Sequence, residues 1–219
     1  MVMTDFIEQV RVGPMALPGV LDLPRGAHGL VLFVHGSGSG SGRRSMRNLH
    51  VAQVLHRHGL GTLLFDLLRD DEAPDRRHVF DIALLASRVG SALRWVAQRS
   101  DLAAWPIGLF SASTGAAAAI VAAVQPPGRV VAMVSRGGRP DLAPGHLASL
   151  DAPTLLIVGG ADPEVLAANR AALRLLRCSK RLEVIPGATH LFEEPAALDS
   201  VAALAADWFD QHLTTRHPS

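Results

Sequence analysis

Three residues that could serve as nucleophile, acid and base each follow a short apolar run of the chain: Ser113, Asp162 and His190. A serine hydroxyl is a weak nucleophile at its own pKa, so it needs a histidine to take its proton and an acid to hold that histidine. The segments between the three residues are long enough to contain whole strand and helix units. The order serine, acid, histidine therefore predicts that the three side chains converge on one site.

The segment around Ser113 is the most informative part of the sequence. Ser111-Ala112-Ser113-Thr114-Gly115 lies where an apolar, strand-like run enters an alanine-rich, helix-like run. The pattern is typical of the nucleophile elbow GxSxG, with serine in place of the first glycine, because small flanking residues permit a sharp turn that exposes the nucleophile. A serine at this position could also simply cap the helix that follows.

Asp162 and His190 each lie in a loop after an apolar run, LLIVGGAD and VIPGATH. Because the carboxyl ends of parallel strands meet at one edge of a sheet, both are expected beside Ser113. Asp141, which follows the preceding strand, competes for the role of the acid. Asp162 is also placed to cap the helix expected from Pro163, and capping does not exclude contact with the histidine.

An acyl-transfer site also needs backbone N–H groups that bind the developing oxyanion. The amide of Thr114 is one candidate, since the dipole of the expected helix favours negative charge there. The second donor is expected from the glycine-rich segment after Val31–Val34, and Ser37 is the candidate. That segment, Gly36–Gly42, lacks the lysine of a GxxxxGK[ST] phosphate loop, so a nucleotide site is the weaker interpretation.

Arginines flank these positions on two sides. Arg136 stands at the end of an apolar run and, with Gly36, is a candidate for contact with the substrate. Arg139, in the same loop, could pair with Asp141. Further arginines follow the glycine-rich segment: Arg43, Arg44 and Arg47. They could meet an anionic group at the mouth of the site or belong to a solvated helix start.

The elements that must position these residues alternate between apolar runs and stretches of helical period, which predicts an α/β protein with a mostly parallel sheet and helices on both faces. Continuous apolar runs indicate interior strands: Val31–Val34, Thr62–Phe65, Ile107–Phe110, Val130–Val134, Thr154–Val158 and Leu182–Ile185. Two weaker runs, Ile7–Val12 and Val20–Leu23, predict an antiparallel hairpin at the sheet edge. Helices are expected over Ser45–His58, Val79–Arg99, Gly115–Val124, Pro163–Leu176 and Pro195–Leu213.

Composition narrows the partners. With 219 residues, of which 48% are apolar and 19% charged, the chain can bury a large core, and one domain over residues 1–219 with a frayed tail over 214–219 is expected. A net charge of +1 is too small for binding to a nucleic acid. An export signal, a membrane span and an internal disulfide are not expected, Cys178 being the single cysteine, so a cytoplasmic location is predicted.

Six segments together resemble the α/β-hydrolase superfamily: FVHGSGSGSG, LFDLL, SASTGAAAA, VSRGGRPDLA, LLIVGGADPEV and PGATHLFEEP. They are most similar to its dienelactone-hydrolase-like members, some of which are fused to a phosphoribosyltransferase domain. The resemblance implies an α/β-hydrolase fold with about eight strands, a triad of Ser113, Asp162 and His190, and hydrolysis of carboxylic esters or lactones. Dienelactone hydrolase itself carries a cysteine where this chain has Ser113.

The sequence thus predicts a serine hydrolase that cleaves a small carboxylic ester or lactone through an acyl-enzyme. No cofactor is expected, and no metal, because no cluster has ligand spacing. No insertion is long enough for a large lid, which favours small soluble substrates. A homodimer is plausible because most oligomeric proteins are homodimers. Two alternatives are acyl transfer or perhydrolysis from the same acyl-enzyme, and a non-catalytic α/β-hydrolase-fold partner of a phosphoribosyltransferase.

Overall fold

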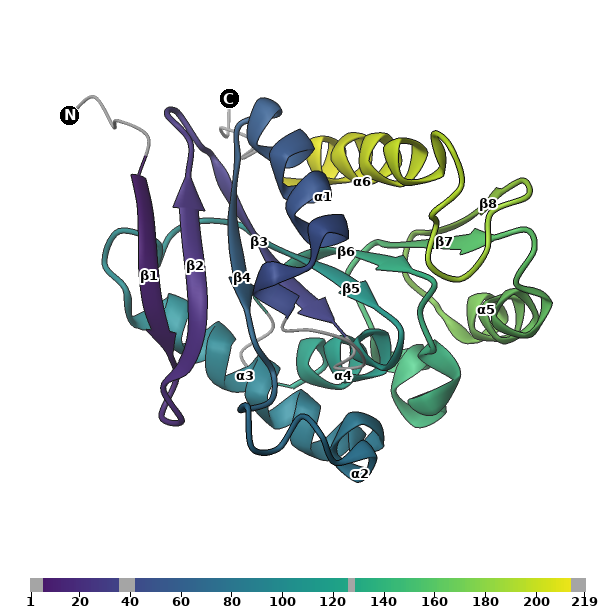
Figure 1. Ribbon diagram of the computed structural model, residues 1–219, viewed down its shortest axis with the longest axis horizontal. Coiled ribbons are helices and arrows are strands. Elements are labelled where there is room, and N and C mark those ends of the chain that lie inside the picture. Colours follow the sequence, from purple (N-terminus) through teal and green to yellow (C-terminus); the bar gives the residue numbers. More distant parts are fainter. Residues whose placement is uncertain (1–5, 36–41, 126–128, 214–219) are drawn as a thin grey trace.

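The computed structural model describes residues 6–35, 42–125 and 129–213. Its centre is one eight-stranded sheet in the order β1-β2-β4-β3-β5-β6-β7-β8 (Figure 1). The strands are β1 (Phe6–Val12), β2 (Leu17–Leu23), β3 (Gly29–His35), β4 (Leu60–Phe65), β5 (Ile107–Ala112), β6 (Val130–Arg136), β7 (Thr154–Gly159) and β8 (Lys180–Ile185). β2 is antiparallel to both of its neighbours, and the pairs from β4 to β8 are parallel.

Helices cover both faces of this sheet, which confirms the predicted α/β architecture. They are α1 (Met46–Arg57), α2 (Arg76–Phe80), α3 (Ile82–Gln98), α4 (Thr114–Ala123), α5 (Pro163–Leu175) and α6 (Ala197–Leu213). α1 and α6 lie on one face, and α3, α4 and α5 on the other (Figure 1). Among the described residues, no helix is both long and apolar enough to cross a membrane.

The central strands are apolar at every position because both of their faces are covered. Side chains alternate between the faces of a strand, so successive residues enter different clusters. In β3 and β5, Leu32 and Leu109 pack in the cluster under α3 and α4. Phe33 and Phe110 pack in the cluster under α1 and α6, with their ring centroids 5.0 Å apart. A continuous apolar run is therefore the correct signal for these strands.

The two edges of the sheet differ in how well the sequence predicts them. The antiparallel hairpin is confirmed, since Val12 pairs with Leu17 and Phe6 with Leu23. The prediction that the run Leu182–Ile185 is an interior strand is wrong. β8 pairs with β7 alone and leaves Lys180 and Arg181 exposed, as edge strands commonly do.

The helix predicted over Val79–Arg99 is in fact two helices, with the break at Asp81. The Asp81 carboxylate accepts a hydrogen bond from the Leu84 amide at 2.9 Å and so caps α3. Asp75 caps α2 in the same way through the Arg77 amide, also at 2.9 Å. The break lets α2 leave the axis of α3 and lie beside the candidate site.

Candidate active site

The parallel strands bring the candidate residues to one edge of the sheet. Ser113 follows β5, while Asp162 and His190 lie in the loops after β7 and β8. Arg136 ends β6 and pairs in register with Ala112, the residue before Ser113. A cavity of about 560 Å³ opens at this edge, and its lining runs from the end of β3 to the end of β5, where the strand order reverses. In open α/β sheets this is the usual place for a ligand.

The turn that carries Ser113 is strained. Its φ of 52° and ψ of −132° lie outside the regions that a side chain favours, and such strain persists only where the surroundings impose it. Its carbonyl accepts hydrogen bonds from the amides of Ala116 (3.1 Å) and Arg139 (3.0 Å). A Cβ on Gly115 would lie 2.4 Å from the Val34 carbonyl oxygen, so α4 can approach β3 this closely only with glycine there.

Ser111 stands where the GxSxG pattern has its first glycine, and its contacts explain why serine is tolerated. The residue is fully buried at the end of β5. Its hydroxyl donates to the Val134 carbonyl of the neighbouring strand at 3.0 Å, so the added polar group is satisfied. The sequence pattern alone did not reveal this hydrogen bond.

Asp162 and His190 contact each other directly. The distance from His190 Nδ1 to Asp162 Oδ2 is 2.8 Å. The other carboxylate oxygen, Oδ1, accepts from the Val165 amide at 3.4 Å and caps α5, so one side chain caps the helix and holds the imidazole. The competing acid Asp141 forms a two-point ion pair with Arg139 instead, at 2.9 and 2.8 Å.

Backbone contacts hold the two loops that carry this pair. The amide of Gly160 donates to the Ile185 carbonyl at 2.8 Å, and that of Ala161 donates to the Ala188 carbonyl at 2.9 Å. A Cβ on Gly159 would lie 2.2 Å from the Ala188 carbonyl oxygen, so this contact also requires glycine. The relative position of acid and histidine is thus fixed by main-chain geometry as well as by their own hydrogen bond.

Of the two oxyanion-hole candidates, the structure describes one. Thr114 is the first residue of α4, is 3% exposed and lines the cavity. Ser37 and Gly36 lie outside the described residues. The chain is described again from Gly42, whose carbonyl accepts from the Asn48 side chain at 3.0 Å. The next residue, Arg43, forms an ion pair with Asp66 at 2.7 Å, which anchors the end of the glycine-rich segment.

The sequence did not reveal one wall of the cavity. Val79 and Phe80 of α2 line it together with Leu191, and they give that side an apolar surface. Three arginines also line it: Arg47, Arg76 and Arg136. Asp75 and Asp81, which cap α2 and α3, are the sequence signals that could have indicated α2, but the direction in which α2 runs depends on tertiary packing.

Arg136 is a half-buried cation of the site. Burial first, and the nearby charge of Arg47 second, lower the pKa of its guanidinium to about 10, so it remains charged at neutral pH. Its Nε and Nη1 atoms are buried and have no hydrogen-bond partner among the described residues. Within those residues, no group of three His, Cys, Asp or Glu side chains is arranged to hold a metal ion.

The sheet and its strained strand-to-helix turn are those of an α/β-hydrolase. The crystal structure of a dienelactone hydrolase from Anabaena variabilis is 52% identical to the chain, with a TM-score of 0.89, and the match covers 96% of this chain and 98% of that one. The chain therefore belongs to the dienelactone-hydrolase-like α/β-hydrolases, a membership that supports a hydrolase activity. Est1E from Butyrivibrio proteoclasticus shares the fold, with a TM-score of 0.77 at 14% identity over 94% of this chain and 98% of that chain.

A second relative extends beyond this chain. A protein of Mycobacterium tuberculosis (strain CDC 1551 / Oshkosh) whose name designates it a phosphoribosyl transferase is 53% identical over 211 residues. The match covers 96% of this chain but 47% of that protein, so the chain spans about half the length of the relative. No family model matches the chain.

Proposed function

We propose that this chain is a serine hydrolase that cleaves a small carboxylic ester or lactone through an acyl-enzyme on Ser113. One observation carries the proposal. A serine held in a strained turn at the start of a helix shares a cavity with a histidine whose Nδ1 lies 2.8 Å from a carboxylate. Nucleophile, base and orienting acid are the three parts that this chemistry needs.

In the proposed reaction, His190 Nε2 takes the proton of Ser113 Oγ as that oxygen attacks the carbonyl carbon. The Asp162 carboxylate accepts a hydrogen bond from Nδ1–H of His190. This hydrogen bond fixes the imidazole tautomer and stabilises the imidazolium that forms. The Thr114 amide donates to the oxyanion, with Ser37 as the proposed second donor. His190 then gives its proton to the leaving alcohol. A water molecule, deprotonated by the same histidine, attacks the acyl carbon, and the acid leaves as Ser113 Oγ takes that proton back from His190.

The cavity suits a small acyl substrate. Its volume of about 560 Å³ falls within the ordinary range for small-molecule sites, roughly 300–1,000 Å³. On the α2 side the wall is a helix of five residues, which is far smaller than a domain-sized lid. A short-chain ester or a lactone is therefore the substrate class that we propose.

The experiment that tests this function is intact-mass spectrometry after incubation with a fluorophosphonate. We expect one adduct on the wild type, none on Ser113→Ala, and the wild-type adduct on the control Ser87→Ala, which removes an exposed helix serine. Turnover of short-chain nitrophenyl esters should fall at least a thousandfold in Ser113→Ala. An unlabelled but folded wild type, or retained turnover in Ser113→Ala, would overturn the proposal.

A second candidate function rests on the length of the Mycobacterium tuberculosis relative, of which this chain covers 47%. A chain that matches half of a longer protein could act as a non-catalytic partner of a phosphoribosyltransferase. The labelling experiment separates the two candidates, because a binding module has no reason to keep an activated serine. Product analysis with added alcohol or peroxide then distinguishes hydrolysis from acyl transfer or perhydrolysis.

A further inference from the structure

The charge of the cavity is one-sided. Arg47 of α1, Arg76 of α2 and Arg136 of β6 line it, and no aspartate or glutamate is among its lining residues in the described part of the chain. We call these three residues the arginine subsite. They come from three separate elements, so their shared position is a property of the fold rather than of one basic stretch.

Arg136 is the arginine of the subsite whose hydrogen-bonding state needs an explanation. Its buried Nε and Nη1 donors are unpartnered within the described residues, whereas buried charges in proteins are normally paired. The Nε atom of Arg47 is also buried and unpartnered there. Both side chains line one cavity, so an anion that enters it would offset the positive charge that these contacts within the described residues leave unbalanced.

The charges around the subsite indicate what that acceptor is. Arg47 Nη1 lies 3.2 Å from a carboxylate oxygen of Glu193, whose side chain is 65% exposed. Arg76 is placed over the Phe80 ring, 5.9 Å from its centroid. With Glu193 set against Arg47, the charges of Arg76 and Arg136 are left for a ligand. A dianion with several acceptor oxygens matches two guanidiniums better than a single carboxylate does.

We propose that the arginine subsite binds a phosphate monoester group at the non-reacting end of the substrate. The inference rests on the proposed function in one respect, that the ester or lactone reacts at Ser113 in the same cavity. It names the substrate class more narrowly, as a small phosphorylated ester or lactone whose phosphate is recognised but not cleaved. Arg136, half-buried on the strand next to β5, and Arg76 are the principal contacts, and Arg47, which already pairs with Glu193, adds a weaker one.

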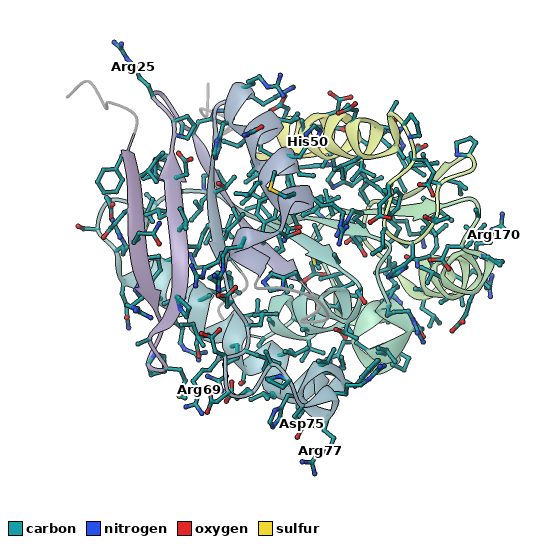
Figure 2. The ribbon with its side chains drawn as sticks, viewed as in Figure 1. Arg25, His50, Arg69, Asp75, Arg77 and Arg170 are labelled. Atoms are coloured by element: carbon teal, nitrogen blue, oxygen red, sulfur yellow. The ribbon has the colours of Figure 1, made fainter. Side chains whose placement is uncertain are left out.

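Binding is tested first without catalysis, on folded Ser113→Ala, by calorimetric titration with methyl phosphate at constant ionic strength. We expect at least tenfold tighter binding than for acetate, and tighter binding at pH 8 than at pH 5.5, because the second pKa of a phosphate monoester is about 6. Adding Arg136→Gln should weaken binding at least tenfold. Arg170→Gln is the matched control, since Arg170 is exposed on α5 (Figure 2), and should change binding less than twofold.

Three outcomes would overturn the proposal: no binding of methyl phosphate, equal binding of acetate, or equal weakening by Arg170→Gln. Because Arg136→Gln could fail to fold, Arg47→Gln provides a second variant, with at least a threefold loss expected. The comparison of methyl phosphate with acetate on Ser113→Ala needs no arginine variant, so it can overturn the proposal even if neither variant folds.

A substrate series separates this inference from the proposed function. The wild type is assayed with 2-acetoxyethyl phosphate, with its neutral isostere 2-tert-butoxyethyl acetate, and with 3-acetoxypropanoate. We expect kcat/KM to be at least tenfold higher for the phosphate ester than for the other two, and Arg136→Gln to reduce that ratio at least tenfold. Equal cleavage of all three substrates would overturn the phosphate subsite but still support the proposed hydrolase function. If the protein binds methyl phosphate but neither cleaves the esters nor is labelled by the fluorophosphonate, the proposed hydrolase function is wrong and the anion site is supported.

Discussion

Two helices contribute to the same cavity, and they are held in opposite ways. Eight residues of α4, beginning with Thr114, are buried between the sheet and its neighbours, and the turn before it is fixed by main-chain hydrogen bonds. α2 has no buried residue at all. One helix starts at the candidate nucleophile, and the other forms part of the wall that a substrate would meet.

Side-chain ion pairs join residues of α2 and of the loop before it. Arg77 pairs with Asp75 at 2.7 Å on the outer side of the helix, where both side chains are labelled in Figure 2. The preceding loop is tied to α3 by the Arg88–Glu72 ion pair at 2.9 Å. The Arg77–Asp75 pair is exposed and lies within the start of the helix, so it contributes little to the position of α2, and the better-buried Arg88–Glu72 pair acts only on the loop before it. Reacting atoms are thus placed by the backbone, while the recognition surface can vary without disturbing them.

The largest effect expected from this comparison concerns the acid. Asp162→Asn should lower kcat on a short-chain ester about ten thousandfold, because the imidazole loses its orienting carboxylate, while asparagine still caps α5. Asp141→Asn should change kcat less than tenfold, since Asp141 pairs with Arg139. Steady-state kinetics with a thermal unfolding scan checks both variants. A larger loss of kcat in Asp141→Asn than in Asp162→Asn would show that Asp141, not Asp162, is the acid.

The next effect tests the backbone contact between the two loops. Gly159→Ala places a methyl group 2.2 Å from the Ala188 carbonyl oxygen, so the loop that precedes His190 must move. We expect a loss of about 1–3 kcal/mol in the free energy of unfolding, with a fall in kcat.

The matched control for this variant is Gly145→Ala, where nothing lies within 4 Å of the added Cβ. Its free energy of unfolding should change by less than about 1 kcal/mol. Urea denaturation measures both, and equal effects would mean that the close approach at Gly159 does not hold the loops.

The sequence predicts the backbone side of the cavity well because its signals are local. Small residues around Ser113 indicate the sharp turn, and continuous apolar runs indicate the buried strands on either side of it. The serine in place of the first elbow glycine was also readable, although its partner, the Val134 carbonyl, lies on another strand.

What the sequence could not supply depends on contacts between distant elements. The apolar run Leu182–Ile185 resembles an interior strand, and only the strand order shows that β8 is an edge. Likewise the burial of Arg136 depends on what surrounds the end of β6. Neither composition nor spacing separates an arginine whose donor atoms are shielded from water, as Nε and Nη1 of Arg136 are, from an exposed one.

A smaller effect is expected where the wall itself is changed. Phe80 is 52% exposed and lines the cavity, so a bulky acyl group should cover part of its ring. Phe80→Ala should raise KM for a benzoyl ester about fivefold, equivalent to roughly 1 kcal/mol of lost apolar contact, and leave KM for an acetyl ester nearly unchanged. Phe6→Ala, which removes a 42% exposed ring on edge strand β1, is the control. A fall in kcat without a rise in KM would mean that α2 contributes to the chemical step and not to substrate binding.

The smallest effect is a pH dependence of α1, the helix that brings Arg47 to the cavity. Burial lowers the pKa of His56 below its ordinary value of 6.5, and the opposing charge of Asp22 only partly restores it. The unfolded chain therefore takes up this proton first as the pH falls, so the free energy of unfolding decreases from about pH 7 downward, by at most about 1.4 kcal/mol per pH unit for one proton.

His56→Gln should flatten that slope, and His146→Gln, at an exposed position, should not. Urea denaturation between pH 7.5 and 5 measures it. An unchanged slope in His56→Gln would mean that acid destabilises the protein at another group.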